Sequence, residues 1–400
     1  MKIAIIGGGF TGLTAAYELV KKGHQVTVFE KEKTLGGLAH GFKLPDWDWH
    51  LESAYHHLFT NDTTILGLIK ELGLSDKLII KRPITATLYH GAMYPLDSPM
   101  HLLRFPGIPL FDRIRTGILL AFLKVNPFWQ PFEHMTAKQL FLTIGGARAW
   151  ETIWEPLMIG KFGTYADRVA ASWLWARIKK RTQKLYYIKG GFHTLISALE
   201  KAIIQRGGTI HTGIQLDTLD QLVKFAKFDK VLLTIHTPSS IPHLHAQTLI
   251  LQTKEPILKN TYWLNITDRS FPFLAVVAHT NMIDKKYYGG HHLTYFGNYL
   301  PEGHPYLSMT KEQLLKKFWP YIKKLNPKLR SNEVTKLYVF TGFYAQPVHE
   351  LHYSRRAPKL ETPIKGLYLA NMDSIYPWDR GTNYAVGLGI KAAKMIHEKE

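Results

Sequence analysis

A glycine-rich turn near the start of the chain constrains the fold more than any other feature of the sequence. The run KIAII at 2–6 is largely apolar and β-branched, which is typical of a strand buried on both faces in a parallel sheet. Gly7, Gly9 and Gly12 follow with the spacing G-x-G-x-x-G. In that pattern the first glycine allows a tight turn, the second lets the backbone approach a pyrophosphate, and the third packs a helix against the strand. The stretch therefore predicts a dinucleotide-binding turn.

The elements around this turn have the expected order. A helix is predicted from about Thr11 to Lys22, and its N-terminus would direct free N–H groups and a positive dipole end at the phosphates. A second strand, 25–29, carries Glu30 at its tip, close to the ~20-residue offset at which an acid binds ribose hydroxyls. The residues of this unit that we expect to contact the dinucleotide are Gly7, Gly9, Phe10, Thr11, Gly12, Glu30 and Lys31.

A glycine pair, Gly36-Gly37, follows the acid and lets the backbone pass close to the cofactor a second time. A pure nicotinamide domain normally continues into another crossover helix at this point. The residues up to here leave three possibilities open: a nicotinamide-dependent dehydrogenase, a flavoenzyme that keeps its cofactor, or a domain that binds a dinucleotide structurally.

The C-terminal end repeats the strand-then-helix pattern. Leu367 to Ala370 predicts a short buried strand, and a helix is expected to begin at Thr382 or Asn383. Gly387 and Gly389 inside that helix are unfavourable by helix propensity. They indicate close approach of a neighbour or ligand, or a helix of small residues packed on the sheet.

These two ends carry a resemblance to a known superfamily. The N-terminal fingerprint through EKEKTLGG and the C-terminal GLYLAN and GTNYAVGLGIKAA resemble the flavin-dependent amine oxidase superfamily, which includes protoporphyrinogen oxidases, phytoene desaturases and UDP-galactopyranose mutases. Stretches such as ESAYHHLFTND and IWEPLMIGKFGTYADRV are similar to a bacterial protoporphyrinogen oxidase-like branch. The resemblance implies that both chain ends surround one FAD, with the last helix pointing its N-terminus at the pyrimidine edge of the isoalloxazine.

The chain departs from the superfamily pattern at two places. Leu38 stands where an arginine usually follows the glycine pair, and Asn371-Met372 replaces the usual Gly-Asp, with Asp373 one position later. The further FAD contacts that the resemblance implies are Gly36, Gly37, Leu38, Asn371, Asp373, Thr382, Asn383 and Tyr384.

The expected fold class is α/β. A Rossmann-type FAD-binding domain, whose parallel sheet has glutathione-reductase-like topology, would be interleaved with an α+β substrate domain. The FAD-binding domain is assigned residues 1–60, 185–250 and 355–400, and the substrate domain 61–184 and 251–354. In the second substrate block, NTYWLNIT and KLYVFTGFYAQ predict an antiparallel sheet, whereas the first block looks helical.

Five side chains are candidates for the catalytic chemistry. His56 and His57 lie in a stretch that the family takes past the flavin, and Lys161 matches the lysine near flavin N5 in amine oxidases. Arg380 would add positive charge beside the last helix, and Tyr344 would line the pocket. Structural histidines and an exposed lysine on a turn are the alternatives. Further pocket-wall candidates are Asn265, His279 and Gln346.

The composition limits the cofactor and the partners. Without cysteine there is no thiolate metal site and no cysteinyl flavin link, so we expect non-covalent FAD; no metal site is predicted. A formal charge of +19 favours an anionic partner, either a phosphorylated ligand or a membrane surface. Nucleic acid ranks last, because no basic block with interleaved aromatic residues occurs.

One segment, 100–132, combines basic and aromatic residues at helical spacing. Its stripe consists of Phe111, Ile114, Ile118, Phe122 and Val125. We expect a buried helix of the substrate domain, and docking on an anionic membrane is the alternative. No signal peptide and no apolar run of ~18 residues is found, so a cytoplasmic location is predicted, with attachment to the inner membrane face left open.

The sequence thus predicts an FAD-dependent oxidoreductase that removes a hydride from a C–N or C–C bond of a small apolar or amphiphilic substrate. One alternative is a non-redox flavin isomerase resembling UDP-galactopyranose mutase, in which Arg355 and Arg356 would clamp a diphosphate. Others are an isoprenoid desaturase and a module that binds FAD only structurally.

Overall fold

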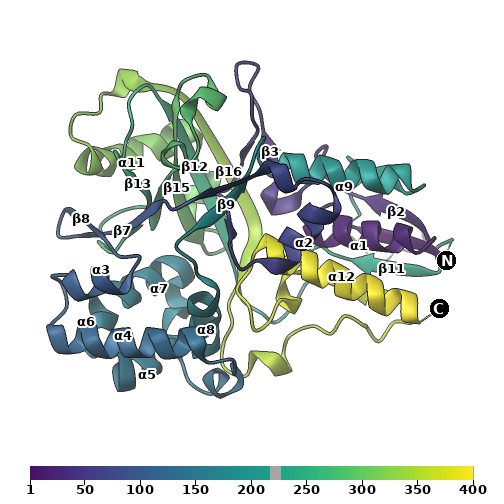
Figure 1. Cartoon of the computed structure of the whole chain (residues 1–400), viewed down its shortest axis with the longest axis horizontal. Coiled ribbons are helices and arrows are strands. Elements are labelled where there is room, and N and C mark those ends of the chain that lie inside the picture. Colours follow the sequence, from purple (N-terminus) through teal and green to yellow (C-terminus); the bar gives the residue numbers. More distant parts are fainter. Residues whose placement is uncertain (217–226, 400) are drawn as a thin grey trace.

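The structure is a computed structural model that describes residues 1–216 and 227–399. Figure 1 shows a parallel sheet flanked by helices at the end that holds both termini, a larger sheet beside it, and a helical lobe at the opposite end. The α/β fold class predicted from the sequence is therefore confirmed.

A five-stranded parallel sheet forms the core of the first part, with the order β10-β2-β1-β11-β17. Its strands are β1 (Lys2–Ile6), β2 (Gln25–Phe29), β10 (Thr209–His211), β11 (Lys230–Leu233) and β17 (Leu367–Leu369). All of them come from the segments that we assigned to the FAD-binding domain. The domain boundaries themselves remain a prediction.

Four helices pack around this sheet: α1 (Phe10–Lys21), α2 (Thr63–Glu71), α9 (His193–Gln205) and α12 (Thr382–Glu398). Helix α1 contacts α9 and α12, and α2 lies against α12. A Cβ atom added at Gly389 would lie only 2.5 Å from the Thr11 carbonyl oxygen. This glycine therefore lets α12 approach α1 closely, whereas Gly387 has only ordinary contact with Thr64.

A seven-stranded sheet, ordered β16-β12-β15-β14-β13-β7-β8, forms the second part. Its pairs are antiparallel except β13 with β7. The two predicted strand runs are confirmed as β13 and β16, but β7 and β8 come from the block expected to be helical. The strands are β7 (Ile84–Tyr89), β8 (Ala92–Pro95), β12 (His243–Thr253), β13 (Thr261–Ile266), β14 (Ala275–Ala278), β15 (His292–Leu300) and β16 (Val334–Pro347).

Smaller elements complete this part. Helix α11 (Lys311–Leu325) buries Leu314, Phe318 and Ile322 in the core beside the seven-stranded sheet. Two small antiparallel sheets pair β3 with β4, and β5 and β6 with β9. Their strands are β3 (Gly41–Phe42), β4 (Leu51–Glu52), β5 (Leu58–Phe59), β6 (Leu78–Lys81) and β9 (Leu185–Ile188).

The helical lobe has its own aromatic core, which includes Phe141, Trp150, Phe162 and Trp173. Its helices are α3 (Pro99–Arg104), α4 (Leu110–Val125), α5 (Ala137–Leu140), α6 (Ala147–Ala149), α7 (Glu155–Phe162) and α8 (Ala171–Lys180).

The structure corrects one expectation about α4. The five apolar residues of its predicted stripe are not buried: their exposed fractions range from 46% at Ile114 to 73% at Val125. The opposite face, with Thr116, Leu119 and Leu123, packs into the lobe instead. No helix in the described part of the chain is both long enough and apolar enough to cross a bilayer.

Candidate functional site

The N-terminal glycines form a turn that no larger residue fits. Gly7 has a φ of +112°, and a Cβ there would lie 2.5 Å from Thr234 Oγ1. At Gly12 an added Cβ would lie 2.0 Å from the Gly7 carbonyl oxygen. The glycine pair reaches the same place, because the Gly36 N–H donates to the Gly8 carbonyl at 2.9 Å. Both predicted glycine motifs therefore form one cradle.

The cradle has the donor set that a dinucleotide needs. Helix α1 begins at this turn, its N-cap Gly9 offers no side-chain cap, and its first turn carries no acidic residue. Its first N–H groups and positive dipole end are thus available to a pyrophosphate. Glu30 lies buried beneath the turn, where its carboxylate accepts the N–H groups of Gly8 at 2.6 Å and Glu32 at 2.9 Å.

The other predicted cofactor residues near the first turn differ in exposure. The Phe10 side chain is buried against Phe192, with ring centroids 6.3 Å apart, so only its backbone can face a ligand. Lys31 is exposed beside Glu32. The Leu38 side chain packs on β16 at Gly342.

At the C-terminal end the predicted residues are held by protein contacts. Asp373 is buried, with its Oδ1 2.6 Å from His243 Nε2, and the Asn371 side chain accepts the Asp373 N–H at 3.1 Å. The Asn383 side chain accepts the Ile65 N–H at 3.0 Å and so joins α12 to α2. Thr382 is the first residue of α12, and Tyr384 stacks on Trp378.

A group of charged side chains lies directly before α12. Lys161 Nζ is 3.2 Å and Arg177 Nη1 is 3.6 Å from Asp379 Oδ2. Arg380 donates its backbone N–H to Asp379 at 3.0 Å. We call the following residues the Asp379 cluster: Lys161, Arg177, Tyr299, Gln346, Asp379 and Arg380.

The Arg380 side chain ties this cluster to the larger sheet. Its Nε donates to Gln346 Oε1 at 3.1 Å, and its Nη2 donates to the Tyr299 hydroxyl. Lys161 comes from α7, Arg177 from α8, Tyr299 from β15 and Gln346 from β16. The cluster is therefore the place where the helical lobe, the larger sheet and the start of α12 meet.

Burial and charge together set the protonation of the cluster. The side chains of Lys161 and Asp379 are only 10% and 15% exposed. Burial alone would raise the pKa of Asp379, but Lys161 and Arg177 hold it well below its usual range. Burial lowers the pKa of Lys161, although Asp379 opposes this. Three cationic side chains face one carboxylate, so the cluster has an excess of positive charge.

The same cationic side chains also shift the pKa of the Tyr299 hydroxyl. Burial would raise the pKa of its hydroxyl, yet Arg380 and Lys161 lower it below its ordinary value. Nearby, His349 is buried, and neither of its ring nitrogens finds a hydrogen-bond partner among the described residues. Such an orphaned polar group suits a site that receives a ligand.

Comparison with known proteins also indicates a site for a dinucleotide cofactor. The chain matches the sequence profile of the family described as Flavin containing amine oxidoreductase over residues 10–251. The chain belongs to this family. The resemblance to the flavin-dependent amine oxidase superfamily and the FAD cofactor are thereby confirmed, and the family is a class of flavin-dependent oxidoreductases.

Individual relatives are more distant. The zeta-carotene desaturase of Solanum lycopersicum is 24% identical over 239 residues, which cover 53% of this chain and 40% of that protein. The chain thus matches less than half the length of this relative. Among solved structures, reduced UDP-galactopyranose mutase has a TM-score of 0.76 at 15% identity, covering 100% of this chain and 96% of that one. An oxidoreductase from Methanosarcina mazei has a TM-score of 0.71 at 20% identity, covering 99% and 100%.

In this member of the family, three sequence-predicted residues come together: Lys161, Arg380 and the pocket-wall candidate Gln346. His56 and His57 lie between β4 and β5 rather than on a strand. Burial lowers the pKa of His56 to about 4 and that of His57 to about 3. Both imidazoles are therefore neutral at pH 7, and His56 is within electrostatic reach of Arg380.

The remaining candidates lie outside the Asp379 cluster. Tyr344 is 38% exposed and stacks on His236, with ring centroids 3.8 Å apart. His279 is buried against the Tyr288 hydroxyl at 2.8 Å, and burial lowers its pKa to about 3. Asn265 accepts the Trp263 indole N–H at 2.9 Å. The catalytic role assigned to Tyr344 remains a prediction.

Sequence reasoning missed Asp379, Tyr299 and Arg177. Asp379 could have been found, because it directly precedes Arg380 and the predicted helix start. Tyr299 and Arg177 gave no local signal, since they reach the cluster only through the packing of β15 and α8.

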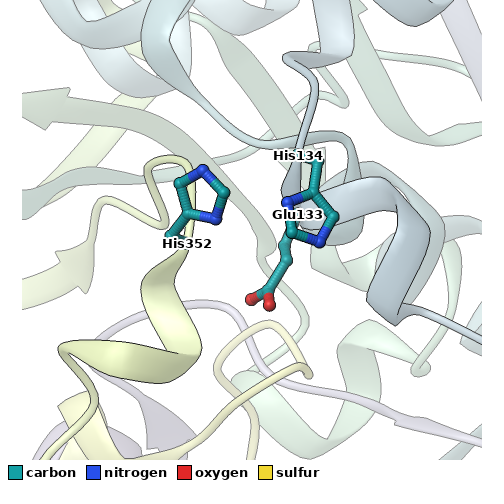
Figure 2. A group of neighbouring side chains, drawn as sticks. All are labelled: Glu133, His134 and His352. Atoms are coloured by element: carbon teal, nitrogen blue, oxygen red, sulfur yellow. The ribbon is translucent and has the colours of Figure 1, made fainter.

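Two further groups of side chains have metal-ligand chemistry, which the sequence spacing did not reveal. One, drawn in Figure 2, combines Glu133, His134 and His352, whose ligand atoms lie within 4.8 Å of one another. The Glu133 carboxylate already accepts the hydroxyls of Ser354 at 2.9 Å and Tyr376 at 3.0 Å. An ion would have to compete with these bonds, and the absence of a metal site stays a prediction. The second group is His236, His243 and Asp373.

Proposed function

We propose that this protein is an FAD-dependent oxidoreductase that removes a hydride from a C–N or C–C bond of an apolar or amphiphilic substrate. The observation that carries the proposal is the Asp379 cluster, a largely buried group with excess positive charge at the N-terminus of α12. When bound at the glycine cradle, FAD would supply the hydride acceptor.

The residues of the cluster would provide the electrostatics of such a site. Arg380 and Lys161 would stabilise negative charge that develops beside them, and the uncapped N-terminus of α12 would add its dipole. Asp379 acts as a positioning residue, since it fixes the Lys161 ammonium. The Lys161 Nζ also lies 5.1 Å from the ring centroids of both Trp173 and Tyr299, which keep bulk water away from it.

An apolar substrate is supported by the relatives that are named for carotenes. The zeta-carotene and 15-cis-phytoene desaturases align with this chain, the latter at 38% identity over 78 residues in Synechococcus elongatus. A desaturation removes a hydride from one carbon and a proton from its neighbour; the aromatic surroundings of the cluster fit the uncharged substrate, and the neutral His56 would accept the proton. Within the proposal, the isoprenoid class therefore ranks ahead of the amines.

The isomerase alternative receives less support. Arg356, expected to help clamp a diphosphate, instead donates to the Glu350 carboxylate and to the Ser240 carbonyl, both at 2.7 Å. Arg355 lies beside it on the exposed surface. The likeness to UDP-galactopyranose mutase is one of fold.

The test is an anaerobic absorbance titration of the FAD-reconstituted protein with an amine, a porphyrinogen, a carotene precursor in detergent and a nucleotide sugar. We expect bleaching of the flavin by one of the first three, and recovery when an oxidant is admitted. A protein that binds no flavin would refute the proposal. Turnover of the nucleotide sugar only after pre-reduction, without net electron transfer, would establish the isomerase. A stable yellow complex that nothing reduces would indicate a structural FAD.

A further inference from the structure

Helix α4 carries an exposed apolar stripe on its outer face. Phe111, Ile118 and Val125 are 70%, 63% and 73% exposed, and they lie two turns apart on one face of the helix. The opposite face of α4 is buried in the helical lobe, so the helix is already anchored without these side chains. The stripe therefore lies largely outside the core, which it reaches only where the Phe122 ring contacts Phe132 among the described ring contacts.

Neighbouring elements add further exposed apolar side chains beside the stripe. Helix α3 packs against α4, and the turn at 141–145 does so as well. Arg115 joins that turn to α4 by donating to the carbonyl of Ile144 at 3.0 Å. We call the surface formed by the following residues the α3–α4 face: Met100, Leu103, Leu110, Phe111, Ile114, Ile118, Phe122, Val125, Phe128, Leu142 and Ile144, each of them exposed.

Soluble monomers rarely expose so many large apolar side chains together, and such surfaces mark contacts with proteins or membranes. In Figure 1 the α3–α4 face lies in the helical lobe, at the opposite end of the molecule from both termini and from α9. A partner can therefore reach it without touching the glycine cradle.

The charges around the α3–α4 face favour an anionic partner. Residues 100–148 contain six Lys or Arg and two Asp or Glu. Arg113 donates to the Leu103 carbonyl at 2.6 Å, and Lys124 donates to the Lys179 carbonyl at 3.1 Å, so both cations are held beside the stripe. An apolar stripe flanked by cations suits the boundary between anionic headgroups and acyl chains.

We propose that the α3–α4 face docks on an anionic phospholipid bilayer and buries the α4 stripe in the interface without crossing it. A second copy of the chain is the competing occupant. It is disfavoured because each copy has a formal charge of +19, which makes like-charged basic faces repel each other. This inference does not depend on the proposed oxidoreductase activity.

The test is flotation of the FAD-reconstituted protein with vesicles of phosphatidylcholine alone and with added phosphatidylglycerol. The variant is the double substitution Phe111→Ser and Ile118→Ser. The matched control is Ile204→Ser with Ile364→Ser, two apolar side chains that are 53% and 54% exposed elsewhere. Light scattering measures the mass of each protein in solution, and circular dichroism checks that each is folded.

We expect the wild type and the control to float with anionic vesicles, less so at high salt. The variant should lose roughly tenfold or more of its vesicle affinity, because two large apolar side chains no longer enter the interface. Equal flotation of variant and wild type would overturn the proposal. So would a wild-type dimer that the same variant dissociates while vesicles bind neither protein.

Discussion

At the scale of single residues, the Asp379 cluster depends on one carboxylate that serves two cations. The change Asp379→Asn keeps the shape but leaves Lys161 and Arg177 without their counter-charge. Breaking a buried pair in this way costs about 3–5 kcal/mol. We expect that loss of unfolding free energy in urea denaturation, together with slower substrate bleaching of the flavin. Glu398→Gln, which removes an exposed partner of Lys394, should change neither quantity measurably.

A second residue-scale prediction concerns pH. Burial lowers the pKa of His279 to about 3 from an ordinary value of 6.5. Between these values the unfolded chain binds more protons, so stability is full above pH 6.5 and falls as the pH drops toward 3. From pH 7 to pH 5 this histidine should cost about 2 kcal/mol.

Replacing His279 by Gln should therefore flatten the acid side of the stability curve by about that amount, measured by urea denaturation at both pH values. The control is His211→Gln, the same substitution at an exposed histidine, which measures how much a His→Gln change by itself alters the curve. If His279→Gln lost as much stability between pH 7 and pH 5 as the wild type, the burial of this imidazole would not be the cause of the loss of stability at acidic pH.

At the scale of elements, the turn between β1 and α1 should tolerate no side chain at Gly12. The change Gly12→Ala would place its methyl group 2.0 Å from the Gly7 carbonyl oxygen and push α1 away from β1. We expect loss of FAD binding in equilibrium dialysis and a lower unfolding midpoint. Gly67→Ala in α2 is the control, since nothing lies within 4 Å of its added Cβ. That variant should keep FAD and gain about 0.5–1 kcal/mol from helix propensity.

The element scale also shows how far the sequence determines this fold. The elements at the two chain ends, β1, α1, β2, β17 and α12, were predictable because their signals are local: glycine spacing, apolar runs and a terminal acid. Strands β7 and β8 were not predicted, although they form a local hairpin through His90 and Gly91; only β7 also pairs with a distant strand, β13. For α4, helical spacing predicted an apolar stripe, but whether that stripe faces the core or the surroundings depends on which neighbours pack against it.

The residues of the candidate site also fall into two groups, those that the sequence identified and those that it missed. Lys161 and Arg380 were found through the resemblance, and Gln346 through its place in an aromatic strand run. Tyr299 was missed because its contact with Arg380, 81 residues further along the chain, leaves no pattern in either segment, whereas Asp379 was overlooked although it directly precedes Arg380.

At the scale of the whole molecule, the Asp379 cluster links the helical lobe to α12, which in turn packs on the cradle helix α1. A ligand bound at the cradle should therefore stabilise α7 and α8 as well as the parallel sheet. At a hundred times its dissociation constant, FAD should raise the free energy of unfolding by about 2.7 kcal/mol.

Hydrogen exchange followed by mass spectrometry can locate this stabilisation. We expect slower amide exchange with FAD not only at 7–12 and 382–398 but also in α7 and α8, since Lys161 and Arg177 connect these helices to Asp379. In Asp379→Asn with FAD bound, protection should persist at the cradle and be lost in α7 and α8. Equal protection of these two helices in the wild type and the variant would show that the lobe is stabilised without the cluster.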